Sequence, residues 1–146
     1  SPVVHRWAGV EHEHHATSHQ LGIPEPQMRD NVIAIERWYA QQFRYLVETL
    51  RATPEGDGNL LDSCAVVWVH EQSHGGTHSR RDMPYVIAGR CGGAIQPGRV
   101  VNLKGEPHAR LLTALAQAMG LPTFQFGETQ INSEPLGILA GGQPPF

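Results

Sequence analysis

The clearest pattern of apolar positions lies between about Gln27 and Ala52. Apolar residues recur there at spacings of three and four, which places them on one face of a helix. These residues are Met28, Val32, Ile35, Tyr39, Phe43, Leu46 and Leu50. Most charged residues of the segment fall on the other faces. The pattern therefore predicts a long amphipathic helix that packs on a sheet.

Two short, continuously apolar runs follow, at residues 64–69 and 83–89. Runs rich in β-branched residues are typical of strands buried on both faces, as in a parallel sheet. Residues 98–103 predict a third, more exposed strand. A second helix is expected to begin near Pro107 and to end at Gly120, because proline favours the first turn and glycine the position after the last.

The order helix, buried strand, long loop, buried strand, helix predicts an α/β fold. We expect part of a doubly wound, mostly parallel sheet flanked by helices. The 146 residues suit a single domain or one half of a larger domain. Within it we expect an irregular, histidine-rich segment (1–25), an α/β core (26–120) and a tail that wraps the surface (121–146).

Composition excludes several classes of protein. With 40% apolar and 17% charged residues, the chain is not expected to be disordered. Its apolar runs are far shorter than the roughly 20 residues that a membrane helix needs. A net charge of −3 without a basic block argues against binding to nucleic acid.

Seven of the nine histidines fall in two short windows, residues 12–19 and 70–78. The second window directly follows the first predicted strand, and functional loops of α/β sheets lie at the carboxyl ends of strands. Neutral imidazole is the commonest metal ligand, and carboxylates join it readily. Since each window supplies a pair of histidines four residues apart, we expect the two windows to meet around one ion. The alternative is that these are surface histidines in polar loops.

The ligand types indicate which metal is expected. A set dominated by imidazole with one or two carboxylates suits zinc, copper or iron better than magnesium or calcium. We expect a divalent transition metal, zinc first. The arginines that follow the second window, Arg80 and Arg81, are most simply surface residues, with the holding of an anionic substrate as the alternative.

Two cysteines cannot form a disulfide scaffold. Cys64 opens the first predicted strand and Cys91 follows the second. In parallel neighbouring strands these positions lie at opposite ends of the sheet, so free thiols are predicted.

Several motifs together resemble an exported bacterial family known as domain of unknown function fifteen-fifty-two. The resemblance spans about residues 14 to 127 and is to the C-terminal part of the family's sequence. The matching stretches are His14-His15-Ala16-Thr17-Ser18-His19, Ile35-Glu36-Arg37-Trp38, Gln42-Phe43, Leu46, Pro54-Glu55-Gly56-Asp57-Gly58-Asn59-Leu60-Leu61-Asp62, His78-Ser79-Arg80-Arg81-Asp82-Met83-Pro84 and Ala88-Gly89.

The family is similar to the alkaline phosphatase and sulfatase superfamily, which implies a doubly wound α/β sheet over a metal centre. In that resemblance, His15 and His19 match a ligand pair, His78 matches the last metal histidine, and the region of His70 and Glu71 matches a strand-end pair. His15 stands where the superfamily has aspartate, and Glu71 follows a histidine where the superfamily has aspartate before one. These departures indicate a site richer in imidazole.

The resemblance also implies context. The superfamily's nucleophile lies in an N-terminal half that has no counterpart here, so we expect a fragment or subunit that works with an N-terminal companion chain or other subunits. Family members carry a twin-arginine export signal, which implies an extracytoplasmic, periplasmic location.

The resulting hypothesis is a metal-binding subunit or fragment of a hydrolase of phosphate or sulfate esters. The predicted ligands are His15, His19, Glu71 and His78, with His70 and His74 as further ligands or as partners of the ligands. One alternative is a redox protein that holds copper or iron in the histidine cluster. Another is a non-catalytic subunit whose histidine-rich face packs against a partner.

Overall fold

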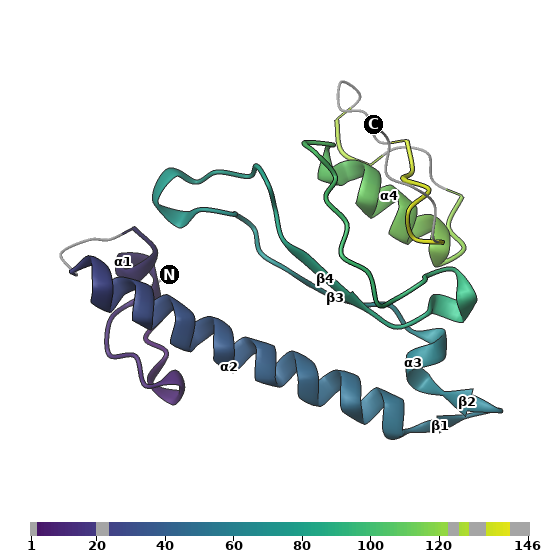
Figure 1. Ribbon diagram of the computed structural model, residues 1–146, viewed down its shortest axis with the longest axis horizontal. Coiled ribbons are helices and arrows are strands. Elements are labelled where there is room, and N and C mark those ends of the chain that lie inside the picture. Colours follow the sequence, from purple (N-terminus) through teal and green to yellow (C-terminus); the bar gives the residue numbers. More distant parts are fainter. Residues whose placement is uncertain (1–2, 20–23, 123–125, 129–133, 141–146) are drawn as a thin grey trace.

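A two-stranded hairpin lies at the centre of the molecule, with helices on either side of it. The structure is a computed structural model. It describes residues 3–19, 24–122, 126–128 and 134–140. Strands β3 (Val66–Val69) and β4 (Tyr85–Ala88) run between the long helix α2 (Glu25–Ala52) and a layer formed by α4 (His108–Ala118) and residues 134–140 (Figure 1).

The strands pair antiparallel, so the predicted doubly wound, mostly parallel sheet is wrong. Val66 lies opposite Ala88 and Val69 opposite Tyr85. The second pair of strands, β1 (Pro54–Glu55) and β2 (Gly58–Asn59), is also antiparallel, and the described residues contain no further sheet. A parallel pair needs a crossover connection, usually a helix. Residues 70–84 contain no α-helix; they form a long loop with one short 3-10 helix and return the chain antiparallel to β3.

The two strands are not buried on both faces, as the apolar runs had predicted. Val67, Val69 and Val86 are 37%, 43% and 45% exposed. Successive side chains of a strand point to opposite faces. The ring of Trp68 therefore faces α2, where it lies 5.8 Å from Phe43, whereas Ile87 packs on the core beneath α4. The third strand expected at residues 98–103 does not form.

Helix α2 confirms the prediction from the apolar stripe. It begins after Pro24, and Pro26 occupies its first turn, where the missing N–H costs nothing. Ile35 is its one buried residue, while Tyr39 and Leu46 are 41% and 45% exposed. The hairpin thus covers only part of the stripe. In the described residues, no helix combines the length and the apolar character that crossing a membrane requires.

The hydrophobic core lies between the hairpin and α4. Its buried members are Cys91, Ile95, Leu111, Ala114, Leu136, Ile138 and Leu139. Helix α4 starts directly after Pro107 and gives way to Gly120, which has a φ of +82°, as predicted. Met119, which directly follows the helix, is 61% exposed, whereas Thr113 within it is fully buried.

A close backbone contact ties the two ends of the hairpin together. Gly89 has a φ of +99°, and a Cβ there would lie 2.2 Å from the carbonyl oxygen of Cys64. A side chain at position 89 would therefore collide with the backbone. The carbonyl of Cys64 also accepts a hydrogen bond from the N–H of Cys91 at 3.0 Å.

Both cysteines are free thiols, as predicted, but the reason given was wrong. The antiparallel pairing brings Cys64 and Cys91 to the same end of the hairpin. The thiol of Cys91 instead turns toward α4, where it donates to the carbonyl of Ala118 at 3.3 Å.

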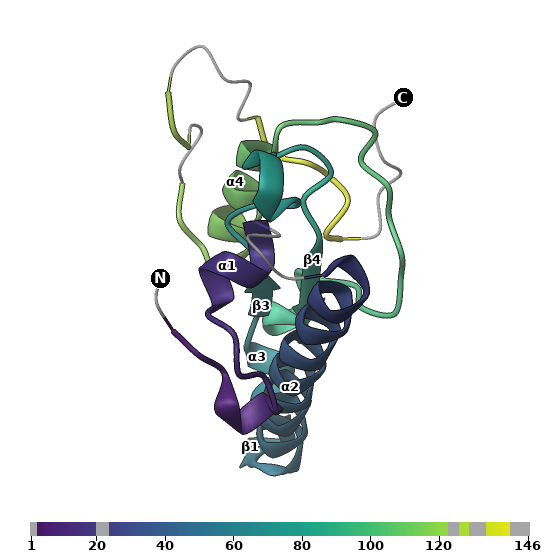
Figure 2. The ribbon, with the colours of Figure 1, turned by 90° about the vertical axis from the view of Figure 1, so that its left-hand side faces the viewer.

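The N-terminal segment is less irregular than expected. It contains a short 3-10 helix, η1 (Arg6–Ala8), and the helix α1 (His14–His19). Figure 2 shows both beside α2. The side-chain amide of Asn31 on α2 donates to Nδ1 of His12 at 3.3 Å. Two of the predicted ligands, His15 and His19, therefore lie on a helix that packs against α2.

Candidate functional site: a histidine cluster between a helix and a loop

The loop between β3 and β4 reaches back over α1. Its turn, η2 (Gly75–Thr77), contacts α1 although the two are far apart in the sequence. The approach is so close that a Cβ on Gly75 would lie 2.9 Å from both Cβ and the carbonyl oxygen of Ser18. Only glycine fits there without a shift, so Gly75 sets the distance between the two histidine windows.

His78 leaves this turn in a left-handed conformation, with φ 53° and ψ 30°. A residue other than glycine in this region costs of order 1 kcal/mol or more, and such strain is concentrated at functional sites. His74 organises the turn: its Nδ1 accepts a hydrogen bond from the N–H of Thr77 at 3.2 Å.

The two windows meet at His19 and His78. Their Nε2 atoms are 3.0 Å apart, and their ring centroids are 4.7 Å apart. The ring of His15, one turn earlier on α1, lies 4.6 Å from the ring of His19. Three imidazoles from two distant stretches of chain are thus gathered in what we call the histidine cluster (His15, His19 and His78).

The cluster favours neutral imidazole. Partial desolvation, followed by the neighbouring rings of His15 and His78, lowers the pKa of His19 below its usual 6.5. The two Nε2 atoms, 3.0 Å apart, can share a hydrogen bond only if one ring donates and the other accepts. The accepting ring must then be neutral, so the two imidazoles cannot both be charged. Neutral imidazole is the form that binds metals.

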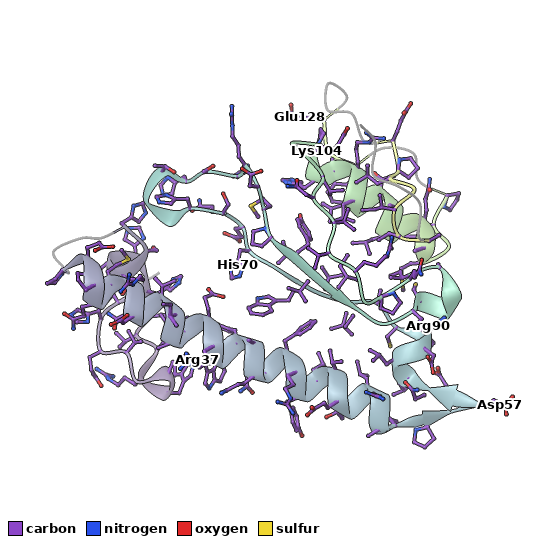
Figure 3. The ribbon with its side chains drawn as sticks, in the orientation of Figure 1. Arg37, Asp57, His70, Arg90, Lys104 and Glu128 are labelled. Carbon is purple, nitrogen blue, oxygen red and sulfur yellow. The ribbon has the colours of Figure 1, made fainter. Side chains whose placement is uncertain are left out.

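The other three predicted ligands lie elsewhere. Nε2 of His70 is 3.3 Å from a carboxylate oxygen of Glu36, which ties the end of β3 to α2 (Figure 3). His74 uses Nδ1 within its own turn. Glu71 is exposed and forms no ion pair or hydrogen bond with the described residues. The structure therefore brings together three of the six residues.

The cluster fits an ion in part. Two nitrogens bound to one tetrahedral zinc ion at about 2.05 Å lie roughly 3.3 Å apart, close to the separation of His19 and His78. Within the described residues, no group of three or more histidine, cysteine, aspartate or glutamate side chains already has the arrangement of a metal site. His15 is exposed, and exposed side chains change rotamer rapidly, so its ring can complete the set.

Sequence reasoning missed a second group of histidines, which has a structural role. His5 is only 5% exposed, and its ring packs edge-on against His14 and Tyr39, with centroid distances of 5.1 and 6.0 Å. Burial, followed by the nearby His5 ring, lowers the pKa of His14. These contacts hold the chain before α1 against α2. No spacing in the sequence distinguishes them from ligands.

The importance of Gly75 was also missed. The Gly75-Gly76 pair in the middle of the second window was the available signal, because paired glycines mark a turn or a close backbone approach. Comparisons with protein-family models, with curated proteins and with solved structures find no match.

Proposed function

We propose that this protein binds a divalent transition-metal ion through His15, His19 and His78. The contact between His19 and His78, 3.0 Å from Nε2 to Nε2, carries the proposal. It joins residues 59 positions apart in the sequence, in a place where a charged imidazole is disfavoured. A donor set made of imidazole supports zinc first, with copper or iron as alternatives.

Three protein ligands leave a coordination position for solvent or substrate, as in catalytic zinc sites. A bound ion of this kind supplies Lewis acidity, which brings the pKa of water toward neutrality. The chain's own residues orient the ligands: Gly75 seats the loop on α1, and His74 holds the turn from which His78 emerges. The hydrolysis of phosphate or sulfate esters, in the company of an N-terminal chain, is the activity that we propose for the complete assembly.

Metal analysis tests the proposal. Purified protein is stripped with a chelator, loaded with Zn²⁺, Cu²⁺ or Fe²⁺, and assayed for bound metal and affinity. We expect one equivalent of ion, lost in His19→Ala and in His78→Ala and strongly weakened in His15→Ala. His108→Ala is the matched control, since His108 is an exposed histidine on α4.

The outcomes separate the alternatives. Preference for zinc supports hydrolysis, and esters such as nitrophenyl phosphate and nitrophenyl sulfate then serve as substrates. Preference for copper or iron supports the redox alternative. If the His19→Ala and His78→Ala variants keep full metal content, the ligand set is wrong. If the wild-type protein binds no ion, the cluster is a packing contact between α1 and the loop that follows β3.

A further inference from the structure

A groove separate from the histidine cluster lies between β4, the irregular segment after it and α4. Its volume is about 1160 Å³, a size that accommodates a small organic molecule. Apolar side chains of the core line its wall. They are Tyr85, Ile87, Ile95, Leu111, Ile138 and Leu139.

The rim of this groove is cationic. It carries Arg80, Arg81, Arg99 and Lys104, against the carboxylates of Asp82 and Glu106. Glu106 is already paired, at 2.6 Å, with Arg110. The chain as a whole has a net charge of −3, so the charge of this rim is opposite in sign to that of the protein. A local excess of one charge at the mouth of a groove concentrates ligands of the opposite sign.

The arginines at the rim lack acidic partners. Arg80 and Arg81 are exposed, and neither forms an ion pair with any described residue. The guanidinium of Arg99 donates to main-chain carbonyls, among them that of Leu139 at 3.2 Å, so no carboxylate balances its charge. Figure 3 labels Lys104 on the segment that leads into α4.

The wall also offers a polar donor. The hydroxyl of Tyr85 forms no hydrogen bond with the described residues, although the ring packs against the core. Its phenol is protonated near neutral pH and can donate, and burial raises the pKa of Tyr85 further above its usual 10. Binding pockets typically combine such apolar walls with a few polar groups that orient the ligand.

We propose that this groove binds a small amphipathic anion: a molecule with an aromatic or short aliphatic body and one carboxylate, sulfate or phosphate group. The apolar wall receives the body, and the arginines at the rim hold the anionic group, since the guanidinium fork matches such anions. The inference depends on the groove alone and holds whether or not the histidine cluster binds a metal.

Binding is tested with three probes on the full chain, treated with a chelator, by calorimetry and by two-dimensional NMR. Naphthalene sulfonate combines both features, naphthalene methanol has only the apolar body, and inorganic sulfate has only the charge. We expect naphthalene sulfonate to bind about tenfold more tightly than either of the others, because both contacts contribute. Equal binding of the neutral and anionic naphthalenes would overturn the assignment of the rim.

Variants localise the site. Arg80→Glu combined with Arg81→Glu should weaken the binding of naphthalene sulfonate by about tenfold or more, because two positive charges that attract the sulfonate are replaced by two negative charges that repel it. The matched control is Arg37→Glu combined with Arg51→Glu, which makes the same charge change at exposed positions on α2. An equal loss in the control would reduce the effect to net charge and refute the site.

Two further variants complete the test. His19→Ala should leave binding of naphthalene sulfonate unchanged; if binding is lost, the anion binds at the histidine cluster and the groove proposal fails. Ile87→Ala should weaken the binding of both naphthalene probes, but Ile87 also packs on the core, so this variant can lose its fold. The exposed arginine variants, which leave the core intact, therefore decide the question if Ile87→Ala does not fold.

Discussion

Replacing Gly75 by alanine tests whether one close backbone contact assembles the histidine cluster. The new Cβ would lie 2.9 Å from Cβ and from the carbonyl oxygen of Ser18, whereas non-bonded carbon atoms prefer about 3.5–4.0 Å. Because one of the contacting atoms is backbone, the loop or α1 must move by roughly 0.6–1 Å. Overpacking of this kind costs about 1–3 kcal/mol.

The shift acts directly on the cluster. Adding it to the 3.0 Å between His19 Nε2 and His78 Nε2 gives roughly 3.6–4 Å, wider than the roughly 3.3 Å that separates two nitrogens bound to one zinc ion. Changes in residues that position metal ligands typically cost 10–100-fold in metal affinity. We therefore expect Gly75→Ala to weaken zinc binding by about that factor while α2 and the core remain folded.

The assay is competition for Zn²⁺ between the protein and a chromogenic chelator, with circular dichroism as a check on folding. Gly137→Ala is the control, because a Cβ on Gly137 meets no atom within 4 Å. If Gly75→Ala binds zinc as tightly as the wild type, the approach of the loop to α1 does not assemble the site and the reasoning is refuted.

Three further predictions concern protonation, the core and the ligand set. Because folding lowers the pKa of His19 below 6.5, the unfolded chain takes up the proton first, so the free energy of unfolding of metal-free protein should fall as the pH drops below 6.5; urea titrations should show a smaller fall in His19→Ala. Leu111→Ala, at a side chain only 3% exposed, should cost about 2–5 kcal/mol in chemical denaturation yet leave zinc affinity unchanged where the protein is folded. Glu36→Gln breaks the half-exposed contact with His70 and should cost no more than about 1 kcal/mol without changing zinc affinity; a loss of zinc affinity would make His70 a ligand after all.

The long helices could be predicted from the sequence, because their periodic patterns are local. Helix α2 carries one apolar stripe along its 28 residues, and α4 is bounded by Pro107 and Gly120. The direction of strand pairing could not be read in the same way. The run Val66–Val69 is as apolar as a strand of a parallel sheet, yet it pairs antiparallel and exposes Val67 and Val69, because two strands offer too little surface to bury both faces.

The candidate site shows a similar division. Clustering of histidines pointed to the two windows, and His19 and His78 do meet. The roles of His70 and His74 could not be predicted, since they depend on which groups the fold supplies nearby. His70 contacts Glu36, which lies on a helix from a remote part of the sequence. The Gly75-Gly76 pair indicates a turn at this place, but it does not indicate that Nδ1 of His74 accepts a hydrogen bond from the N–H of Thr77.

The two histidine windows meet through a contact between a loop and a helix, not at the edge of a parallel sheet as predicted. The geometry of the candidate metal site therefore depends on that contact. The prediction placed both at the carboxyl edge of a parallel sheet, where a rigid scaffold would hold the ligands. Instead, the loop after β3 extends beyond the hairpin and packs on α1, where Gly75 lies directly against Ser18. Loops open locally at lower free energy than a core. Changes that weaken the contact between the loop and α1 should therefore lower metal affinity. Changes that weaken the packing of α4 on the hairpin should instead lower the free energy of global unfolding.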